Sequence, residues 1–263
     1  MAQRTMQPND ILWDDLYERD SEGYIVKKQN YPDLAFRMFC RVFKYKGFAI
    51  KEHCQEREIE LTKLAGDCSV KVYGHVVRFD SGPDRKQPRE VGLVMELARP
   101  LPEYARQADG SGKHRIKAEM IALVERLHTQ YNMVHGDIKP DNFLVCEDNK
   151  IKLCDFEGGR LVDESVEIWE SLEPLALNGR YTPQYMNKTR DTFVPPTKDD
   201  DWYALAISIW EIYTDKDAFE GIYEEEDLVL LHSTGQTVDL NEVKDVETRE
   251  WIRGILRKGG ASV

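Results

Sequence analysis

The sequence has no long hydrophobic run. None of its apolar stretches approaches the roughly 20 residues that a membrane-spanning helix needs, and its first ten residues are polar, without the apolar centre of a secretory signal. We therefore expect a protein of the cytoplasm or nucleus with no membrane segment. Hydrophobic residues still make up 41% of the 263 residues, enough for the core of one large domain or two small lobes.

Cysteine is scarce, and its spacing argues against two kinds of site. The cysteines are odd in number and far apart, and no pair has the C-x-x-C spacing of a zinc site or a redox motif. The five residues are Cys40, Cys54, Cys68, Cys146 and Cys154. We interpret all five as reduced thiols.

Positive charge is also in deficit, with 36 Lys and Arg against 48 Asp and Glu, a formal net charge of -12. Nucleic-acid binding needs clustered basic side chains to neutralise phosphates, so we exclude a nucleic-acid partner. Acidic residues are dense between Asp155 and Gln184. Such a run is either a solvated face or a surface for a basic protein substrate.

Hydrophobic periodicity divides the chain into a strand-rich first third and a helix-rich remainder. Strands are expected at residues 24–26, 36–43, 48–50, 70–79, 91–97, 143–145 and 151–153, and helices at 11–19, 54–64, 202–213 and 246–256. Ile116, Met120, Leu123 and Leu127 recur at i, i+4, i+7 and i+11, one face of a buried helix. This order predicts an α+β protein of two lobes.

Two polar loops carry the chemistry. The segment MVHGDIKPDNFLV contains Asp137, Lys139 and Asn142, and a second acidic loop, Asp155-Phe156-Glu157-Gly158, begins 18 residues (155 - 137) after Asp137. Glycine, proline, aspartate and asparagine all favour turns, so each loop alone could be a surface turn. A surface turn does not require these charged residues at these offsets, nor a second acidic loop at this distance.

Together, the two loops resemble the catalytic loop and the metal-binding loop of eukaryotic-type protein kinases. The resemblance extends from about Tyr24 to Leu256. It implies a bilobal kinase-like fold in a single domain, 1–263. Residues 1–97 would form a small antiparallel β-sheet N-lobe with a short N-terminal extension, and residues 98–263 a mainly helical C-lobe. It also implies ATP and Mg²⁺ as cofactors.

The resemblance assigns a role to each charged residue of these loops. Asp137 would act as catalytic base toward the substrate hydroxyl, and Lys139 would lie against the transferring phosphate. Asn142 and Asp155 would supply oxygen ligands to Mg²⁺. A lysine two residues after the aspartate is typical of serine/threonine kinases.

Upstream, Phe48-Ala49-Ile50-Lys51 is similar to the family's V-A-I-K strand, in which the lysine holds the α- and β-phosphates. The glutamate that pairs with this lysine would be Glu56, Glu58 or Glu60. We choose Glu58, because it points nearest to the apolar face of the expected helix.

The adenine base would be bound by the segment Val94–Ala98, which resembles the family's hinge. Met95 would be the gatekeeper residue, and the backbone of Glu96 and Ala98 would hydrogen-bond the base. Ala49 and Leu144 would enclose the adenine ring. Asp201 resembles the aspartate that braces the catalytic loop, although it would also serve as a helix N-cap.

Several positions depart from the family pattern. No glycine lies between Gly23 and Gly47, so the glycine-rich phosphate lid is absent. Gly136 replaces an arginine that pairs with a phosphorylated activation loop, and Glu157 replaces the glycine of the metal-binding loop. We therefore expect any activity to be independent of an activating phosphate.

Two further departures lie near the C-terminal part of the chain. The A-P-E motif reads Thr182-Pro183-Gln184, and Leu177 then occupies the place of the threonine that contacts the catalytic lysine. The last helix of the family is expected to be missing, which shortens the C-lobe.

Three functions remain open. The first is a serine/threonine kinase, since every charged residue that the chemistry requires is present. The second is a pseudokinase that binds or scaffolds with weak or no turnover, suggested by the missing lid and Glu157. The third is a small-molecule kinase, because aminoglycoside-type phosphotransferases also carry a His-Gly-Asp loop.

Overall fold

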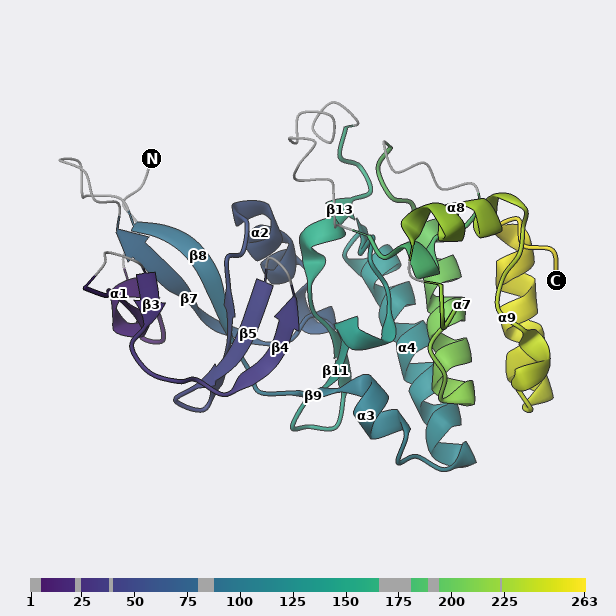
Figure 1. Cartoon of the computed structure of the whole chain (residues 1–263), viewed down its shortest axis with the longest axis horizontal. Coiled ribbons are helices and arrows are strands. Elements are labelled where there is room, and N and C mark those ends of the chain that lie inside the picture. Colours follow the sequence, from purple (N-terminus) through teal and green to yellow (C-terminus); the bar gives the residue numbers. More distant parts are fainter. Residues whose placement is uncertain are drawn as a thin grey trace. The chain divides into compact units, whose positions relative to one another are not determined.

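The computed structural model of the chain describes residues 6–21, 25–37, 40–79, 88–165, 181–188, 194–222 and 224–263. The chain divides into two compact units. The first comprises Met1–Lys63 and Val70–Ala98, and the second comprises Leu64–Ser69 and Arg99–Val263. The first is built mainly of strands and the second mainly of helices (Figure 1). The α+β class predicted from the sequence is therefore confirmed.

A six-stranded sheet forms the centre of the first unit, with the strand order β1-β7-β8-β6-β5-β4. Neighbouring strands are antiparallel, except that β1 lies parallel to β7 at one edge. β2 and β3 form a separate hairpin. The elements are β1 (Ile11–Leu12), α1 (Trp13–Leu16), β2 (Tyr17–Arg19), β3 (Ile25–Lys27), β4 (Asp33–Arg37), β5 (Cys40–Tyr45), β6 (Phe48–Glu52), α2 (Glu56–Leu64), β7 (Val72–Phe79) and β8 (Pro88–Met95).

The segment before β4 packs on this sheet through aromatic residues. Trp13 stacks on Tyr17 with ring centroids 4.0 Å apart, and both are buried in one cluster with Leu16 and Tyr31. The sheet contributes Phe43, Ile50, Val76 and Val94 to this cluster. The helix expected at residues 11–19 has only four residues, because the residues before it pair with β7 and those after it with β3. Aromatic burial and strand pairing outweigh a marginal helix.

The single strand expected at residues 36–43 is a hairpin in the structure. β4 and β5 pair antiparallel up to Arg37 and Cys40, so only two residues of the sequence lie between them. The prediction was wrong because those two residues, Met38 and Phe39, include none of the usual turn formers.

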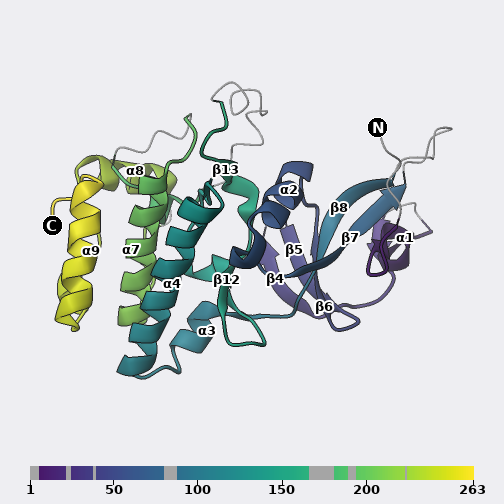
Figure 2. The ribbon, with the colours of Figure 1, turned by 180° about the vertical axis from the view of Figure 1, so that it is seen from behind.

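Three long helices organise the second unit: α4 (Gly110–Gln130), α7 (Lys198–Thr214) and α9 (Val246–Lys258). α7 packs against both α4 and α9, as Figures 1 and 2 show from opposite sides. It is buried nearly all round as a result. On α4, all four residues of the predicted apolar face are buried. In the part of the chain that the structure describes, no helix is long and apolar enough to cross a lipid bilayer.

Short strands, helices and 3-10 turns make up much of the rest of the second unit. They are β9 (Arg99–Pro100), α3 (Leu101–Ala105), β10 (Met133–Val134), β11 (Phe143–Val145), β12 (Ile151–Leu153), β13 (Arg160–Leu161) and α8 (Glu225–Ser233), with 3-10 turns at Gly66–Cys68, Pro140–Asn142, Phe156–Gly158, Pro183–Tyr185 and Leu240–Glu242. β11 pairs with β12 and β9, and β10 pairs with β13. Because β10 precedes the first polar loop and β13 follows the second, their pairing brings the two loops together.

Candidate active site

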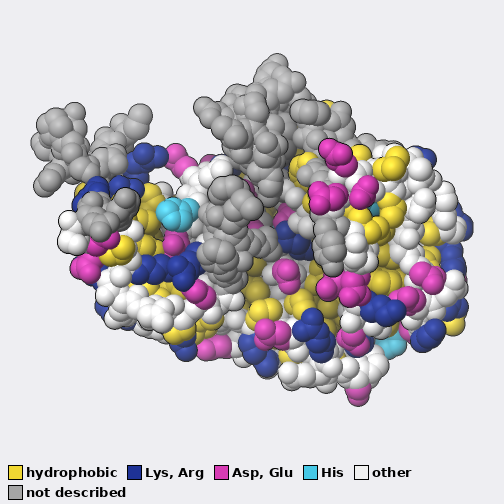
Figure 3. All heavy atoms as spheres, viewed as in Figure 1, with side chains coloured by type: hydrophobic (Ala, Val, Ile, Leu, Met, Phe, Trp, Pro, Cys, Tyr) yellow, Lys and Arg dark blue, Asp and Glu magenta, His cyan; other side chains and the backbone are white. Residues whose placement is uncertain are grey.

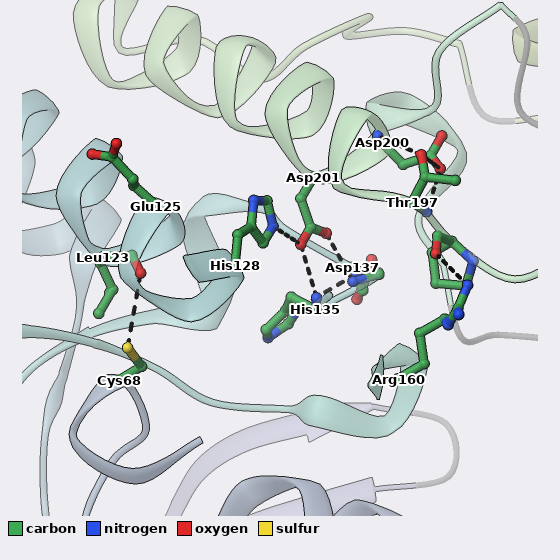
Figure 4. A network of polar contacts seen from close by, with 12 residues as sticks. Cys68, Leu123, Glu125, His128, His135, Asp137, Arg160, Thr197, Asp200 and Asp201 are labelled. Atoms are coloured by element: carbon green, nitrogen blue, oxygen red, sulfur yellow. Dashed lines mark hydrogen bonds and ion pairs between the residues drawn. The ribbon is translucent and has the colours of Figure 1, made fainter. Parts of the chain in front are cut away.

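Asp201, near the start of α7, holds the backbone of the first polar loop. Its Oδ2 accepts a hydrogen bond from the amide of His135 and its Oδ1 one from the amide of Gly136, both at 2.8 Å. The Nε2 of His128 lies 2.8 Å from Oδ2, and the carboxylate is 1% exposed (Figure 4). The N-cap of α7 is Thr197, so Asp201 braces the loop and does not cap the helix.

Asp137 and Lys139 lie in direct contact within this loop. The ammonium of Lys139 forms an ion pair with Oδ2 of Asp137 and donates to the hydroxyl of Thr182 at 2.5 Å. That hydroxyl donates in turn to Oδ1 of Asp137 at 2.7 Å. The three side chains thus form a closed polar triangle that fixes the carboxylate.

Thr182 was missed by the sequence analysis. Leu177, which was expected to occupy the position of the threonine beside the lysine, lies outside the described residues, and Thr182 makes that contact. The expectation that this threonine is lost is therefore wrong. The error arose from matching Thr182-Pro183-Gln184 to A-P-E.

Asn142 links the loop to the strand that follows it. Its side-chain amide donates to the carbonyl oxygen of Asp137 at 2.7 Å and to the carboxylate Oδ2 at 3.2 Å, and the residue is 1% exposed. Its own carbonyl accepts the amide of Cys154 at 3.0 Å, which positions the chain just before Asp155. Asp155 has a φ of +67°, in the left-handed region that directs the backbone into the turn Phe156–Gly158.

These two residues suit a Mg²⁺ ion shared with phosphates. Because the amide nitrogen of Asn142 is bonded to Asp137, the side-chain oxygen is the atom suited to a cation, and Asp155 adds a carboxylate. Within the described residues, no group of three or more His, Cys, Asp or Glu side chains could hold a metal. Magnesium bound through one or two protein oxygens, with phosphates and water, does not need such a cage.

In the first unit, Lys51 and Glu58 form a buried salt bridge. Lys51 in β6 is 5% exposed and Glu58 in α2 is 3% exposed. The structure pairs the lysine with Glu58 rather than with Glu56 or Glu60. Two charges at this depth have to be paired, because an isolated one would be strongly destabilised by the loss of water.

The expected adenine-binding residues are distributed over both units. Ala49 in β6 and Met95 in β8 are cross-strand partners, and both are buried. The amide of Glu96 donates to the carbonyl of Lys71 at 2.9 Å, so its carbonyl is the group suited to a base. Ala98 ends the first unit. Leu144, in the second unit, lies in β11 opposite Pro100 and is half-buried.

A pocket of about 110 Å³ in the second unit was also missed. Its lining includes four acidic residues (Asp141, Glu211, Asp215 and Asp217), two basic ones (Arg106 and Lys216) and Tyr185. Glu211 accepts hydrogen bonds from the hydroxyl of Tyr185 at 2.9 Å and from the amide of Ala218 at 2.6 Å. Burial raises the pKa of Glu211 to about 7.

The acidic stretch between Asp155 and Gln184 was expected to be a solvated face or a surface for a basic substrate. Glu167, Glu170 and Glu173 lie outside the described residues. On the face of the molecule in Figure 3, acidic and basic side chains occur side by side over the second unit.

The family model for the protein kinase domain matches residues 48–254. Receptor-interacting serine/threonine-protein kinase 1 of Homo sapiens is 28% identical over 224 residues, which cover 79% of this chain and 32% of that protein. Dual specificity mitogen-activated protein kinase kinase 7 of Homo sapiens is 32% identical over 136 residues, 48% of this chain and 30% of that protein.

Mitogen-activated protein kinase 13 of Oryza sativa subsp. indica is 24% identical over 212 residues, 77% of this chain and 40% of that protein. The chain therefore spans between about a third and two fifths of the length of these curated relatives.

Proposed function

Because this chain belongs to the protein kinase domain family, we propose that it transfers the γ-phosphoryl group of ATP to a serine or threonine hydroxyl of a protein. Its fold is the bilobal α+β fold of that family. The observation that carries the proposal is the triangle of Asp137, Lys139 and Thr182, which holds a carboxylate and an ammonium in fixed positions.

In the proposed reaction, the substrate hydroxyl oxygen attacks the γ-phosphorus, and the bond from that phosphorus to the β,γ-bridging oxygen breaks. Asp137 accepts the hydroxyl proton, and ADP leaves with the bridging oxygen. A carboxylate has about four lone-pair sites, so Asp137 can accept this proton while it keeps its bonds to Lys139 and Thr182. The ammonium of Lys139 stabilises the charge on the transferring phosphoryl group.

The remaining residues bind and orient the nucleotide. Lys51, held by Glu58, would contact the α- and β-phosphates, and Asn142 and Asp155 would hold Mg²⁺, which neutralises phosphate charge when bound. Ala49, Met95, Leu144 and the backbone of Glu96 and Ala98 would contact adenine. The buried Lys51–Glu58 pair supports this assignment, because the salt bridge fixes the ammonium group of Lys51.

We also propose that the protein substrate carries basic residues near its target hydroxyl. The acidic pocket supports this, because its carboxylates outnumber its basic residues and it includes Asp141, which lies in the catalytic loop two residues after Lys139. A substrate lysine or arginine would pair with these carboxylates.

A second candidate is a pseudokinase. The sequence from β4 to β5 favours it, since it contains no glycine and close approach of backbone amides to phosphates usually needs glycine. The small-molecule kinase is the third candidate, and it rests on Gly136.

The decisive experiment follows labelled γ-phosphate from Mg-ATP into a panel of basic and acidic proteins, with D137N as the matched control. Label that depends on Asp137 and appears on serine or threonine supports the proposal. Nucleotide binding without transfer supports the pseudokinase. Labelled metabolites with unlabelled proteins support the small-molecule kinase.

A further inference from the structure

The two polar loops touch at a pair of glycines. Gly136 has a φ of +79°, and a Cβ atom added to it would lie 2.2 Å from the carbonyl oxygen of Gly158 and 2.9 Å from the carbonyl carbon. Atoms of this kind do not approach each other so closely. Any side chain at position 136 therefore has to displace the backbone of Gly158.

The opposite side of Gly136 gives little room for adjustment. The same added Cβ would lie 3.0 Å from Cγ of Pro196, and the amide of Gly136 is held by the buried carboxylate of Asp201. The bond to Asp201 in α7 thus holds the catalytic loop in place. A side chain at position 136 would therefore displace the backbone of Gly158 rather than that of Gly136.

Gly158 is connected to Asp155 through a short, pinned turn. Phe156 is fully buried, and its ring centroid lies 4.8 Å from that of His135. The ring nitrogen Nε2 of His135 lies 3.0 Å from the carbonyl oxygen of Cys154. Because the residues on both sides of Asp155 are held, a shift of Gly158 changes the backbone angles of the turn that starts at Asp155.

We propose that Gly136 is a positioning residue: its lack of a side chain lets the catalytic loop pack directly on Gly158, and this contact sets the position of Asp155 relative to Asp137. The inference rests on the proposed function, in which Asp155 holds Mg²⁺. The contact with Gly158 gives a steric reason why position 136 is a glycine. Placing at position 136 the arginine that the family usually carries would therefore lower activity rather than raise it.

The test compares G136A with G221A. Gly221 also has a positive φ, +89°, but an added Cβ there meets nothing within 4 Å. Both variants place an alanine at a positive φ, which strains the backbone. Only G136A also places a Cβ atom against the backbone of Gly158. G136A is expected to lower kcat about a hundredfold, as a misplacement of about 1 Å can do, and to raise the Mg²⁺ concentration required for nucleotide binding. G221A should change neither more than about twofold.

Hydrogen exchange of the nucleotide-free protein gives a readout that does not depend on activity. The amide of Cys154 donates to Asn142 and that of Gly159 to Phe156, both at 3.0 Å. In G136A these amides should exchange about tenfold faster or more, while those of α4 and α7 keep their rates. Faster exchange throughout α4 and α7, or a variant that does not fold, would indicate general destabilisation and overturn the proposal.

A second measurement needs no variant. If the glycine contact couples the loops, the amide of Gly136, bonded to Asp201, and the amide of Gly159, bonded to Phe156, should open in one event, with the same dependence on denaturant. Separate opening would overturn the inference.

The two proposals can fail independently. A wild-type protein with no Mg²⁺-dependent nucleotide binding and no phosphoryl transfer would refute the proposed function. The hydrogen-exchange data would still test the contact between Gly136 and Gly158. A working wild-type enzyme with an unaffected G136A variant would refute this inference alone.

Discussion

The hydroxyl of Tyr17 donates a hydrogen bond to the carboxylate of Glu52, and both residues are buried. Glu52 directly follows Lys51 in β6, and neighbouring side chains of a strand point to opposite faces of the sheet. Lys27 lies 3.1 Å from the same carboxylate and 3.6 Å from the centroid of the Phe43 ring. A segment that precedes the matched kinase range is therefore bonded to the strand that carries Lys51.

Replacing Tyr17 with phenylalanine removes only the hydroxyl. The buried Glu52 then loses a hydrogen-bond donor, so we expect the free energy of unfolding to fall by about 1–3 kcal/mol. Urea unfolding of Y17F measures this, with Y73F as control because Tyr73 is 36% exposed. Equal stabilities of the two variants would show that the Tyr17–Glu52 bond contributes nothing.

A second prediction concerns the buried pair of Lys51 and Glu58. K51M alone leaves a buried carboxylate without its cation, which costs about 3–5 kcal/mol of stability. The double variant K51M/E58Q removes both charges and should recover most of that stability. It should not recover ATP binding, because the phosphates still lack the lysine.

Thermal unfolding and calorimetric titration with Mg-ATP separate these two effects. If K51M/E58Q bound ATP as tightly as the wild type, Lys51 would be a structural residue with no role in nucleotide binding.

Whether a structural feature could be predicted from the sequence depends on how many residues separate the interacting partners along the chain. The face of α4 and the strands beside the two loops follow from patterns that lie within a few residues of one another, and they were predicted. Glu58 was chosen from the apolar face of its helix, although Leu64 on that face is 47% exposed and Ile59 is buried. That choice therefore rested on an incomplete pattern.

The contacts that were missed join distant segments. Thr182 meets Asp137 across 45 positions and Tyr185 meets Glu211 across 26, and neither pair leaves a periodic signal. The N-terminal segment, residues 11–19, was predicted as a short helix, while its conformation depends on strand partners elsewhere in the chain. Tertiary packing decides such cases.

The triangle around Asp137 gives a third prediction. T182A removes the hydroxyl that orients the carboxylate, and we expect kcat to fall at least about tenfold with little change in the KM for ATP. T182S keeps the hydroxyl and should stay within about threefold of the wild type. The comparison is made with steady-state kinetics on one protein substrate. Equal losses in both variants would assign the effect to packing of the threonine methyl group.

The last prediction is a pH dependence centred on Glu211. Burial raises its pKa to about 7 from an ordinary value of 4.5, so the folded protein binds a proton that the unfolded chain releases. The resulting stabilisation is complete below pH 4.5 and is lost as the pH rises toward 7. E211Q stays neutral at every pH. Its stability relative to the wild type should therefore rise by roughly 1–3 kcal/mol between pH 5 and pH 8.

Urea unfolding of both proteins at the two pH values measures this difference. If the difference did not change with pH, Glu211 would have to be ionised throughout, with the acidic pocket hydrated enough to keep its charge. A basic peptide that binds in the pocket should lower the pKa of Glu211, since a nearby cation favours the charged carboxylate. The stability gap between E211Q and the wild type should then narrow at pH 8 when the peptide is present. A smaller stability difference in the presence of the peptide would show that the basic peptide binds beside Glu211, as the proposed preference for basic substrates requires.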